Sequence, residues 1–386
     1  MTFKPGYSRF LQGLGEKLHF CAHSHHPWPD CTREAQLRAW DDAAARADEK
    51  WDIVFGEQIP LAQGAIAGAL RLPETGNIAF APNTHEFVCR LLSCIPDRPR
   101  ILTTDSEFHS FSRQAARLEE DGAEIRRVPV EPFSTFAERF AGEAKGGTWH
   151  MSFLSQVFFN SGHRLAEKEL EIIAAAVGDK TMLVLDGYHA FMAVPVDLSR
   201  LGKRAFYLAG GYKYAQAGEG VCFLSVPPGC ALRPRNTGWF ADFSGLEKGI
   251  TTPVDYGDGG WRFWGSTFDP SGLYRWNAVT AWRRSLDLTV EKSDAHARAL
   301  QVRFLKRLAE KPRGPFRAEA LVSIDLPRMG HFLTFRLPDA PAVSKRLAAE
   351  HGVLTDARGD RLRFGFGLYH DEGDVEDLFR RLDRFV

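Results

Sequence analysis

Short apolar runs alternate with amphipathic stretches through the first two thirds of the chain. Runs rich in β-branched and aromatic residues predict strands, and apolar positions at helical spacing predict helices. We expect strands at 77–82, 100–104, 124–130, 148–154, 182–186, 204–208 and 221–226. Helices are expected between them at 61–72, 87–95, 112–120, 135–141 and 166–177. This alternation is typical of an α/β fold with a mostly parallel sheet covered by helices, whose ligands bind beyond the carboxyl ends of the strands.

The two ends of the chain have a different pattern. Residues 18–29 hold two prolines and predict an extended segment that turns into a loop, followed by a helix at 30–49. A long helix is expected at 272–309. The remainder predicts strands at 331–337, 353 and 361–366 with helices at 342–351 and 375–385. We therefore expect an N-terminal segment that packs on the small domain and the site entrance (1–55), a large domain (56–270), and a linking helix with a smaller α/β C-terminal domain (271–386).

Composition excludes several classes of function. Among 386 residues, Lys and Arg total 49 and so do Asp and Glu, so no net field favours nucleic acid or a membrane surface. No apolar run approaches the ~20 residues of a membrane helix, and the first residues lack the apolar core of a signal peptide. The six cysteines show no CxxC spacing, which predicts a reduced, cytoplasmic protein. No G-x-G-x-x-G or P-loop motif is present.

A histidine-rich loop, with His23, His25 and His26, invites a metal interpretation. It lacks the spacing of a helical HxxxH pair and has no cluster of acidic residues beside it, so no metal site is predicted. A loop that lines a polar pocket fits the pattern better.

One lysine lies in a small-residue segment between two predicted strands, Leu208-Ala-Gly-Gly-Tyr-Lys-Tyr-Ala-Gln-Ala-Gly-Glu-Gly220. Burying an ammonium group without a partner is costly, and a lysine whose pKa is lowered in this way is suited to forming Schiff bases. An ordinary turn with an exposed Lys213 is the alternative interpretation.

Two further features belong with Lys213. Asp186 ends a predicted strand 27 residues earlier (213 − 186 = 27), and Asn83-Thr-His-Glu86 forms a turn between a strand and a helix. Taken singly, the aspartate predicts a cap and the turn predicts either an anion site or a helix cap. Together they provide the three requirements of pyridoxal 5′-phosphate: a carboxylate for the ring nitrogen, a lysine for the aldehyde and an anion site for the phosphate.

At this point the chain resembles a known family. Leu185-Asp-Gly-Tyr-His-Ala with Gly211-Tyr-Lys-Tyr resembles the class V aminotransferase superfamily of fold type I enzymes, and kynureninases most closely within it. Phe20-Cys-Ala-His-Ser resembles the N-terminal Leu-Cys-Gly-Asn-Ser loop of kynureninases. Three other segments also resemble kynureninase motifs: Gly238-Trp239, Gly265-Ser266 and Leu362-Arg-Phe-Gly365.

The resemblance implies a role for each matching position. Catalysis falls to Lys213 as the Schiff-base lysine, Asp186 at the pyridine nitrogen and Tyr212 at the phosphate. The remaining cofactor contacts implied are Thr84, His85, Phe108, Gln156, His189, Trp239 and Ser266. Arg363 would hold the substrate carboxylate, beside His23 and Ser24. Trp239 and Ser266 would reach the site of a partner subunit, which implies a homodimer with shared sites.

The match also has departures. Glu107-Phe-His-Ser replaces the Phe-Pro-Ser-Asp of kynureninases and is more similar to the Glu-His-His-Ser of other class V members. Glu86 stands where a hydroxyl residue is usual, and Gly367 stands where a proline is usual. These departures bear on the substrate more than on the cofactor.

The main hypothesis is a kynureninase-like hydrolase, which cleaves the Cβ–Cγ bond of kynurenine to give anthranilate and alanine. The alternative is a class V aminotransferase, lyase or epimerase that acts on another amino acid. A non-catalytic protein that retained the fold is a third class. A cysteine desulfurase is disfavoured, because no cysteine follows Cys230.

Overall fold

The computed structural model describes residues 2–249 and 252–385. Within these ranges a seven-stranded sheet has the order β2-β8-β7-β6-β5-β3-β4. Its strands are β2 (Ile78–Ala81), β3 (Arg100–Thr104), β4 (Glu124–Val128), β5 (Met151–Ser155), β6 (Met182–Asp186), β7 (Ala205–Gly210) and β8 (Cys222–Ser225). Neighbours from β7 to β4 are parallel, whereas β8 is antiparallel to both β7 and β2. The predicted mostly parallel sheet is confirmed.

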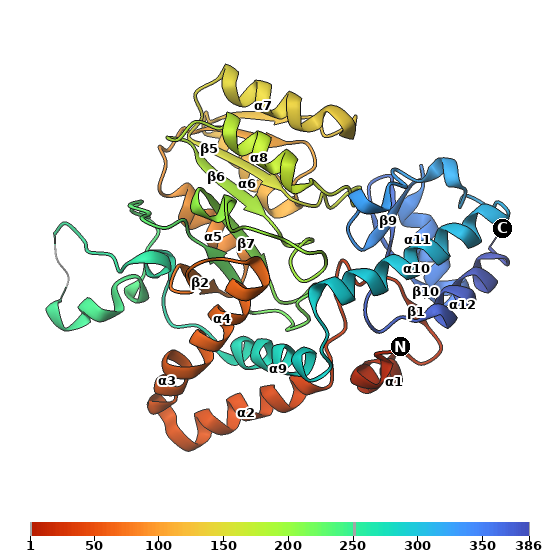
Figure 1. Cartoon of the computed structure of the whole chain (residues 1–386), viewed down its shortest axis with the longest axis horizontal. Coiled ribbons are helices and arrows are strands. Elements are labelled where there is room, and N and C mark those ends of the chain that lie inside the picture. Colours follow the sequence, from red (N-terminus) through yellow and green to blue (C-terminus); the bar gives the residue numbers. More distant parts are fainter. Residues whose placement is uncertain (1, 250–251, 386) are drawn as a thin grey trace.

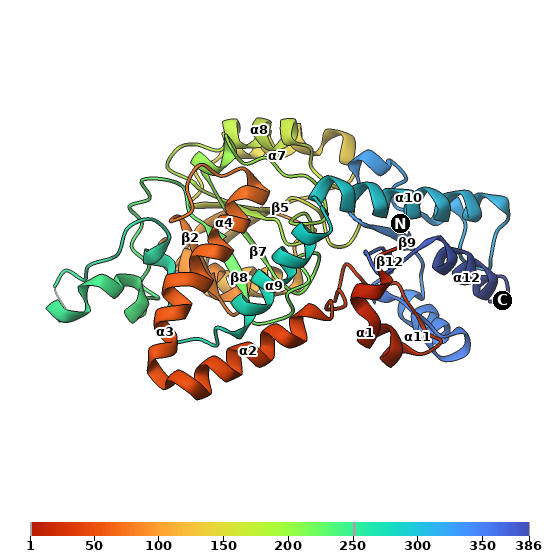
Figure 2. The same ribbon diagram turned by 60° about the horizontal axis from the view of Figure 1, so that its bottom comes forward.

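Helices follow the strands as the pattern predicted. They are α5 (Thr84–Leu92), α6 (His109–Glu120), α7 (Phe136–Gly146) and α8 (Glu167–Ala176). α7 and α8 lie side by side in both views (Figures 1 and 2). The strands β2, β5, β7 and β8 are buried along their whole length, because both faces of the sheet are covered.

A helical stretch from Cys31 to Leu70 precedes the first strand of the large sheet. It contains α2 (Cys31–Arg46), a 3-10 turn (Ala47–Glu49), α3 (Lys50–Ile53), a π-helical turn (Val54–Gln58) and α4 (Ile59–Leu70). By length and composition one window of it, among the described residues, could cross a membrane. A core helix passes the same test, and α2 and α4 both pack against α9 (Ser271–Ser285).

The expected single helix at 272–309 is wrong. It is two helices, α9 and α10 (Val290–Glu310), separated by residues 286–289. Asp287 in this break has the left-handed φ of 48°, which ends α9 and turns the chain toward the C-terminal unit.

The C-terminal unit has its own core. An antiparallel sheet has the order β11-β12-β9, and a two-stranded parallel sheet pairs β1 with β10. These elements are β1 (Leu18–His19), β9 (Phe332–Arg336), β10 (Val353–Leu354), β11 (Asp356–Arg358), β12 (Arg361–Gly365), α11 (Ala340–His351) and α12 (Glu372–Leu382). Leu18 and Phe20 belong to the same apolar cluster as Phe304, Phe335 and Phe379. A short N-terminal helix, α1 (Ser8–Leu14), lies nearby (Figure 1). The domain limits expected at residues 55 and 270 stay predictions.

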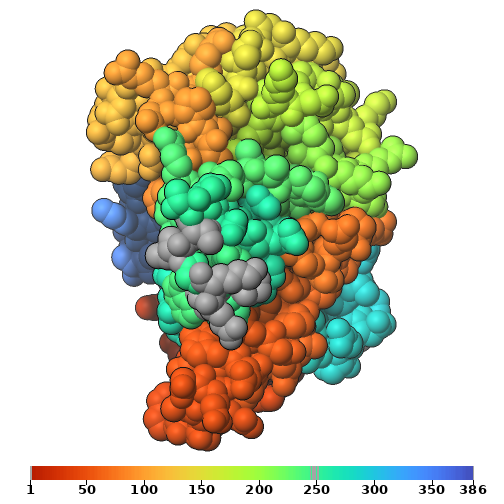
Figure 3. Space-filling model, turned by 90° about the vertical axis from the view of Figure 1, so that its left-hand side faces the viewer, coloured from red at the N-terminus to blue at the C-terminus, as the bar shows by residue number. Residues whose placement is uncertain are grey.

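The segment after β8 covers one end of the molecule beside the Cys31–Leu70 stretch (Figure 3). Trp239 is 46% exposed and Phe243 is 36% exposed in this segment. Large exposed aromatic side chains in one segment are typical of contact surfaces.

Candidate active site

The lysine turn connects two adjacent strands of the large sheet. β7 ends at Gly210 and β8 begins at Cys222, and Lys213 lies between them. A Cβ at Gly210 would lie 2.2 Å from the Sγ of Cys222, and one at Gly211 would lie 2.7 Å from the carbonyl oxygen of Gly218. Only glycine permits such a close approach of backbone segments. The Gly-Gly pair therefore lets the chain double back and carry Lys213 at the sheet edge.

Lys213 is buried among aromatic rings and one histidine. Its side chain is 4% exposed, and Nζ lies 2.8 Å from Nε2 of His189. The ring centroids of Tyr188, Phe108 and Tyr212 lie 4.6, 5.4 and 5.6 Å from Nζ. Burial lowers the pKa of Lys213 to about 7, although the charge of Asp186 opposes the shift. A substantial share of neutral amine is therefore present near neutral pH, as a nucleophile requires.

Asp186 stands at the carboxyl end of β6, next to the strand that carries the lysine turn. Its Oδ1 accepts a hydrogen bond of 2.8 Å from the amide of Tyr188. Burial raises the pKa of Asp186, and the nearby Lys213 lowers it. A Cβ at Gly187 would lie 1.9 Å from the Oη of Tyr207, so the turn after Asp186 also needs glycine.

His189 completes the Asp186-Gly-Tyr-His189 turn. Burial lowers the pKa of His189 well below its usual value, and the charges of Lys213 and Arg363 lower it further. The ring is therefore neutral when it contacts Nζ of Lys213. Its Nδ1 is buried and has no hydrogen-bond partner among the described residues.

The start of α5 lies against the lysine turn. Asn83 caps the helix by accepting a 3.0 Å hydrogen bond from the amide of Glu86. The backbone amides of Thr84 and Gly211 both point to the thiol of Cys222, which places the two turns together. Thr84 is half-buried and His85 is exposed in the first turn of the helix. The first turn of a helix, where the helix dipole favours negative charge, suits a phosphate group.

Phe108 and Gln156 occupy neighbouring strand ends. Phe108 immediately precedes α6 and is 36% exposed beside Lys213. Gln156 follows β5, and its amide donates to the carbonyl oxygen of Asp186 at 2.8 Å. Its Oε1 accepts from the Oη of Tyr207 at 3.1 Å. The structure thus brings both side chains to the edge where Asp186 and Lys213 lie.

Arg363 lies on β12 and is paired within the chain. It is 4% exposed, and its guanidinium donates to Oδ2 of Asp356, its register partner on β11. Nη1 also donates to the carbonyl oxygen of Phe159 at 2.5 Å, while Nε is buried without a partner among the described residues. Burial lowers the pKa of Arg363, and Asp356 opposes that shift. The residue predicted to hold a substrate carboxylate already faces a carboxylate of the protein.

His23 joins the lysine side of the site to the arginine side. Its ring lies 6.5 Å from that of His189 in a stacked arrangement, and its Nε2 lies 3.7 Å from Oδ2 of Asp356. Both ring nitrogens are buried without a hydrogen bond to any described residue, and burial lowers the pKa of His23 well below its usual value. Ser24, next in the loop, is half-buried and its Oγ lies 3.4 Å from Nδ1 of His25. The amide of His26 donates to the carbonyl oxygen of Tyr212 at 3.0 Å, which fixes the loop to the lysine turn.

Trp239 and Ser266 lie together, at a different place from Lys213. A Cβ at Gly238 would lie 2.3 Å from the carbonyl oxygen of Gly265, so their two segments are in direct contact. Ser266 is exposed beside a cavity of about 200 Å³. None of the contacts described for Trp239 or Ser266 reaches Lys213. Their role toward a partner subunit stays a prediction.

Two acidic residues at the site were not assigned a role from the sequence. Asp356 gave no local signal, because its pairing with Arg363 depends on the register of β11 and β12. Glu107 is 3% exposed and accepts hydrogen bonds from Oγ1 of Thr104 (2.7 Å) and Oγ of Ser155 (2.6 Å). Burial raises its pKa to about 7, and the charge of Asp186 adds to the shift. Its position three residues after the strand predicted at 100–104 was the available signal.

These residues fit a bound pyridoxal phosphate. A buried lysine of low pKa, a carboxyl group one strand away and a helix N-terminus lie at one sheet edge, and the unpaired Nδ1 of His189 is a polar atom that the chain itself does not satisfy. Asp186 would hold the ring nitrogen and the start of α5 the phosphate. This fold with this set of residues defines a fold type I pyridoxal-phosphate protein.

Comparisons with known proteins identify the family. The family model described as "Aminotransferase class-V" matches residues 39–335, which is 297 of the 386 residues. The chain therefore belongs to the class-V aminotransferase family and is a pyridoxal-phosphate enzyme. No curated protein matches the chain in a sequence search.

Several solved structures share the fold. A lysine-to-alanine variant of C-DES, with glycine covalently linked to the PLP cofactor, has a TM-score of 0.82 at 18% identity and covers 100% of both chains. The cystine C–S lyase C-DES in complex with its product, cysteine persulfide, has a TM-score of 0.81 at 19% identity and covers 97% of this chain and 99% of that one. Cysteine desulfurase from Thermococcus onnurineus NA1 has a TM-score of 0.79 at 15% identity and covers 100% and 98%. At these identities the likeness establishes the fold. The predicted closeness to kynureninases is not shown by these comparisons.

Proposed function

We propose that this enzyme is a lyase that cleaves a carbon–sulfur bond in a cysteine-derived amino acid. The observation that carries the proposal is that the cysteine side chains at the site are protonated thiols at neutral pH. Burial raises the pKa of both Cys21, beside Arg363 and Asp356, and Cys222, beneath the lysine turn, to about 12. Among enzymes that cleave a C–S bond, a desulfurase needs a cysteine thiolate to accept the sulfur, so these thiols favour a lyase, from which the sulfur leaves with the product. The likeness to the C–S lyase C-DES supports the same reaction.

The residues of the chain suit an elimination. Arg363 binds the substrate carboxylate in exchange for Asp356, which orients the Cα–H bond. Neutral Lys213 takes the Cα proton, and His189, 2.8 Å from Nζ, keeps that amine in place. The bound cofactor supplies the electron sink that makes the Cα proton acidic. The Cβ–S bond then breaks and the sulfur leaves as a thiol or persulfide. With one water, the carbon skeleton is released as pyruvate and ammonium.

Product analysis tests this proposal. The purified holoenzyme is incubated with cystine and with an S-alkyl cysteine, and pyruvate, ammonium and alanine are measured. We expect equal amounts of pyruvate and ammonium, no alanine, and unchanged turnover in a Cys21→Ser variant. Alanine formation that requires a protein cysteine would show a desulfurase and overturn the proposal.

The same assay distinguishes the other hypotheses by their products. Hydrolysis of kynurenine, the main prediction from sequence, would release fluorescent anthranilate together with alanine. Transamination would require a keto-acid acceptor and would release no ammonium. The comparisons favour the alternative that includes a lyase over kynurenine hydrolysis.

We also propose that the enzyme acts as a homodimer in which Trp239 and Ser266 reach the partner's cofactor site. The exposed Trp239 and Phe243 support a contact surface at that end of the molecule (Figure 3). Light scattering coupled to size-exclusion chromatography should give twice the chain mass of 43.2 kDa. A monomer that is fully active would exclude shared sites.

A further inference from the structure

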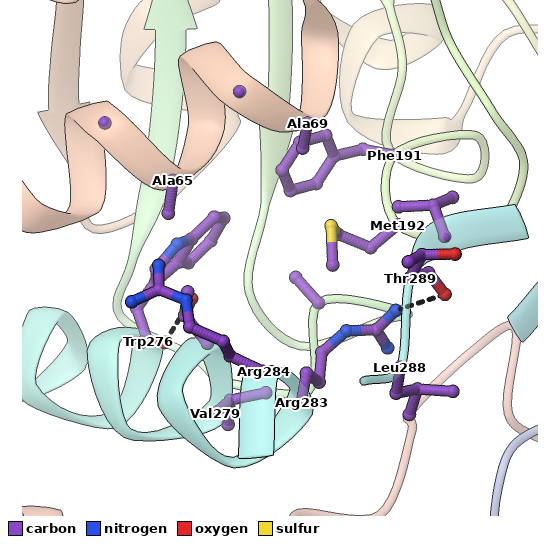
Figure 4. Close-up of a pocket in the computed structure, with 15 residues that line it drawn as sticks. Ala65, Ala69, Phe191, Met192, Trp276, Val279, Arg283, Arg284, Leu288 and Thr289 are labelled. Atoms are coloured by element: carbon purple, nitrogen blue, oxygen red, sulfur yellow. Dashed lines mark hydrogen bonds between the residues drawn. The ribbon is translucent and has the colours of Figure 1, made fainter. Parts of the chain in front are cut away.

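A cavity of about 290 Å³ lies between α4, α9 and the turn that follows His189 (Figure 4). Its walls include the apolar side chains of Phe191, Trp276 and Leu288. Cavities of about 150 Å³ with apolar linings already bind benzene. This cavity therefore has room for an aromatic ring or branched chain together with a polar substituent.

The α4 wall of the cavity is made of small residues. Gly64 and Gly68 are exposed, and a Cβ built at either position meets no atom within 4 Å. The cavity therefore opens at α4, and its width there depends on the absence of two side chains.

Arg283 places a buried guanidinium in this cavity. It is 4% exposed, and its Nη2 donates to the carbonyl oxygen of Thr289 (3.2 Å) and to Oγ of Ser293 (2.8 Å). Nη1 has no hydrogen-bond partner among the described residues. Figure 4 shows the side chain reaching from α9 to a position between Met192 and Thr289. Nη1 is closed off from the cavity, so Arg283 contributes its charge to the cavity wall. An anion in the cavity would offset the cost of burying that charge.

Arg284 adds a second guanidinium at the same cavity. It is exposed and reaches past Trp276 toward Ala65 (Figure 4). Its side chain makes no hydrogen bond or ion pair within the described part of the chain, and no described lining residue is Asp or Glu. Two cations without an acidic neighbour produce a positive potential in a site with apolar walls.

We propose that this cavity binds a small carboxylate that carries an aromatic or branched apolar body. The carboxylate pairs with the exposed guanidinium of Arg284 within the positive potential of Arg283, and the apolar body packs on Phe191, Trp276 and Leu288. A bare inorganic anion does not match the site, because it would leave these apolar walls in contact with water.

This site is separate from the substrate site, but its lining includes residues of the same two segments that carry His189 and Lys213. Phe191 and Met192 lie two and three residues after His189, and Ala215 lies two residues after Lys213. Met192 has a left-handed φ of 60°, a conformation unfavourable for a residue with a side chain. An occupant of the cavity therefore rests on the backbone that carries both His189 and Lys213.

Direct binding of 4-fluorobenzoate to the holoenzyme, followed by ¹⁹F NMR of the ligand, tests the proposal. The neutral isostere 4-fluorobenzamide should bind at least about tenfold more weakly, because it lacks the charge-assisted hydrogen bonds. Binding of 4-fluorobenzoate should persist in an Arg363→Met variant, in which the substrate-site guanidinium is absent. Equal affinity for the amide, or loss of binding in Arg363→Met, would overturn the proposal.

Variants that leave the fold intact locate the site. Gly68→Leu fills the α4 opening without a clash and should weaken binding at least about tenfold, while Arg284→Met should weaken it about fivefold. Gly142→Leu is the matched control, since Gly142 is an exposed helical glycine of α7 whose Cβ would also meet no atom. Arg283→Met should weaken binding, because the cavity wall loses a buried positive charge. If Arg283→Met does not fold, Gly68→Leu and Arg284→Met decide: wild-type affinity in both would place the ligand elsewhere.

Discussion

Lys213 and Arg363 are two cations with the same exposed fraction, 4%, and opposite surroundings. Lys213 meets a neutral histidine and three aromatic rings, and its pKa falls to about 7. Arg363 meets the carboxylate of Asp356 and a backbone carbonyl. A guanidinium cannot be deprotonated under these conditions, so its burial requires a partner, whereas an amine can lose its proton instead.

The difference in surroundings prepares the two side chains for different roles, proton transfer by Lys213 and carboxylate binding by Arg363. Among the described residues Lys213 has no ion-pair partner, so burial lowers its pKa. The neutral amine can then act as a nucleophile and a base. The arginine is kept charged by the internal carboxylate of Asp356, which a substrate carboxylate would replace in the proposed mechanism. Each of the following substitutions changes one side of this comparison.

Removing the lysine should have the largest effect. Lys213→Ala should lower kcat by at least about 1,000-fold and abolish the yellow chromophore that borohydride reduces, because we propose that the side chain is both the Schiff-base amine and the Cα base. Absorbance spectra and steady-state kinetics check this. Lys203→Ala, at an exposed lysine, is the control. A reducible Schiff base that persisted without Lys213 would refute its assignment.

Removing the arginine should mainly affect substrate binding. Arg363→Met should lower kcat/KM about 100-fold, chiefly through KM, as expected for a lost bidentate carboxylate contact. Arg363→Lys should recover only part of the loss, because an ammonium lacks the planar fork. Arg358→Met is the matched control, since Arg358 also contacts Asp356 at 2.9 Å but its side chain is 45% exposed. An unchanged KM in Arg363→Met would place the carboxylate elsewhere.

Removing the internal carboxylate should separate binding from stability. Asp356→Asn should lower KM several-fold, because Arg363 is freed, and lower the free energy of unfolding by about 3 kcal/mol, because a buried charge loses its partner. Substrate titration and urea unfolding of the same preparation measure the two effects. Asp360→Asn, at a more exposed pair with Arg361, should change neither. If KM rose instead, Asp356 would be positioning Arg363 for the substrate and not competing with it.

The smallest effect is a pH dependence of the cofactor-free protein. The folded pKa of Lys213, about 7, lies below the ordinary lysine value of 10.5, so the unfolded chain binds more protons between these values. Stability should therefore rise with pH above 7, by at most about 1.4 kcal/mol per pH unit from this residue. The slope between pH 7.5 and 9 should be smaller in Lys213→Met. Identical slopes in both proteins would show that burial does not lower the pKa of Lys213 in the folded protein.

Site residues that stand in a recognisable local sequence pattern could be predicted from the sequence. Asp186 ends an apolar run and Lys213 lies in a glycine-rich turn, so both could be placed at one sheet edge. Contacts set by register or by packing could not be predicted: the pairing of Asp356 with Arg363, the antiparallel direction of β8, and the ring of His23 between the two halves of the site. The break at Asp287 was missed because the apolar periodicity continues across it.

The pairing of β1 with β10 has a consequence for synthesis on the ribosome. Leu18 pairs with Val353, a separation of 335 residues (353 − 18 = 335). At about 5–20 residues per second, the segment around Leu18 waits roughly 20–70 s for its partner strand. During that time its apolar residues, Phe20 among them, have no finished core to enter. The segment around Leu18 is thus made well before the strand that completes its core, and until then the nascent chain should stay open to proteases and chaperones there.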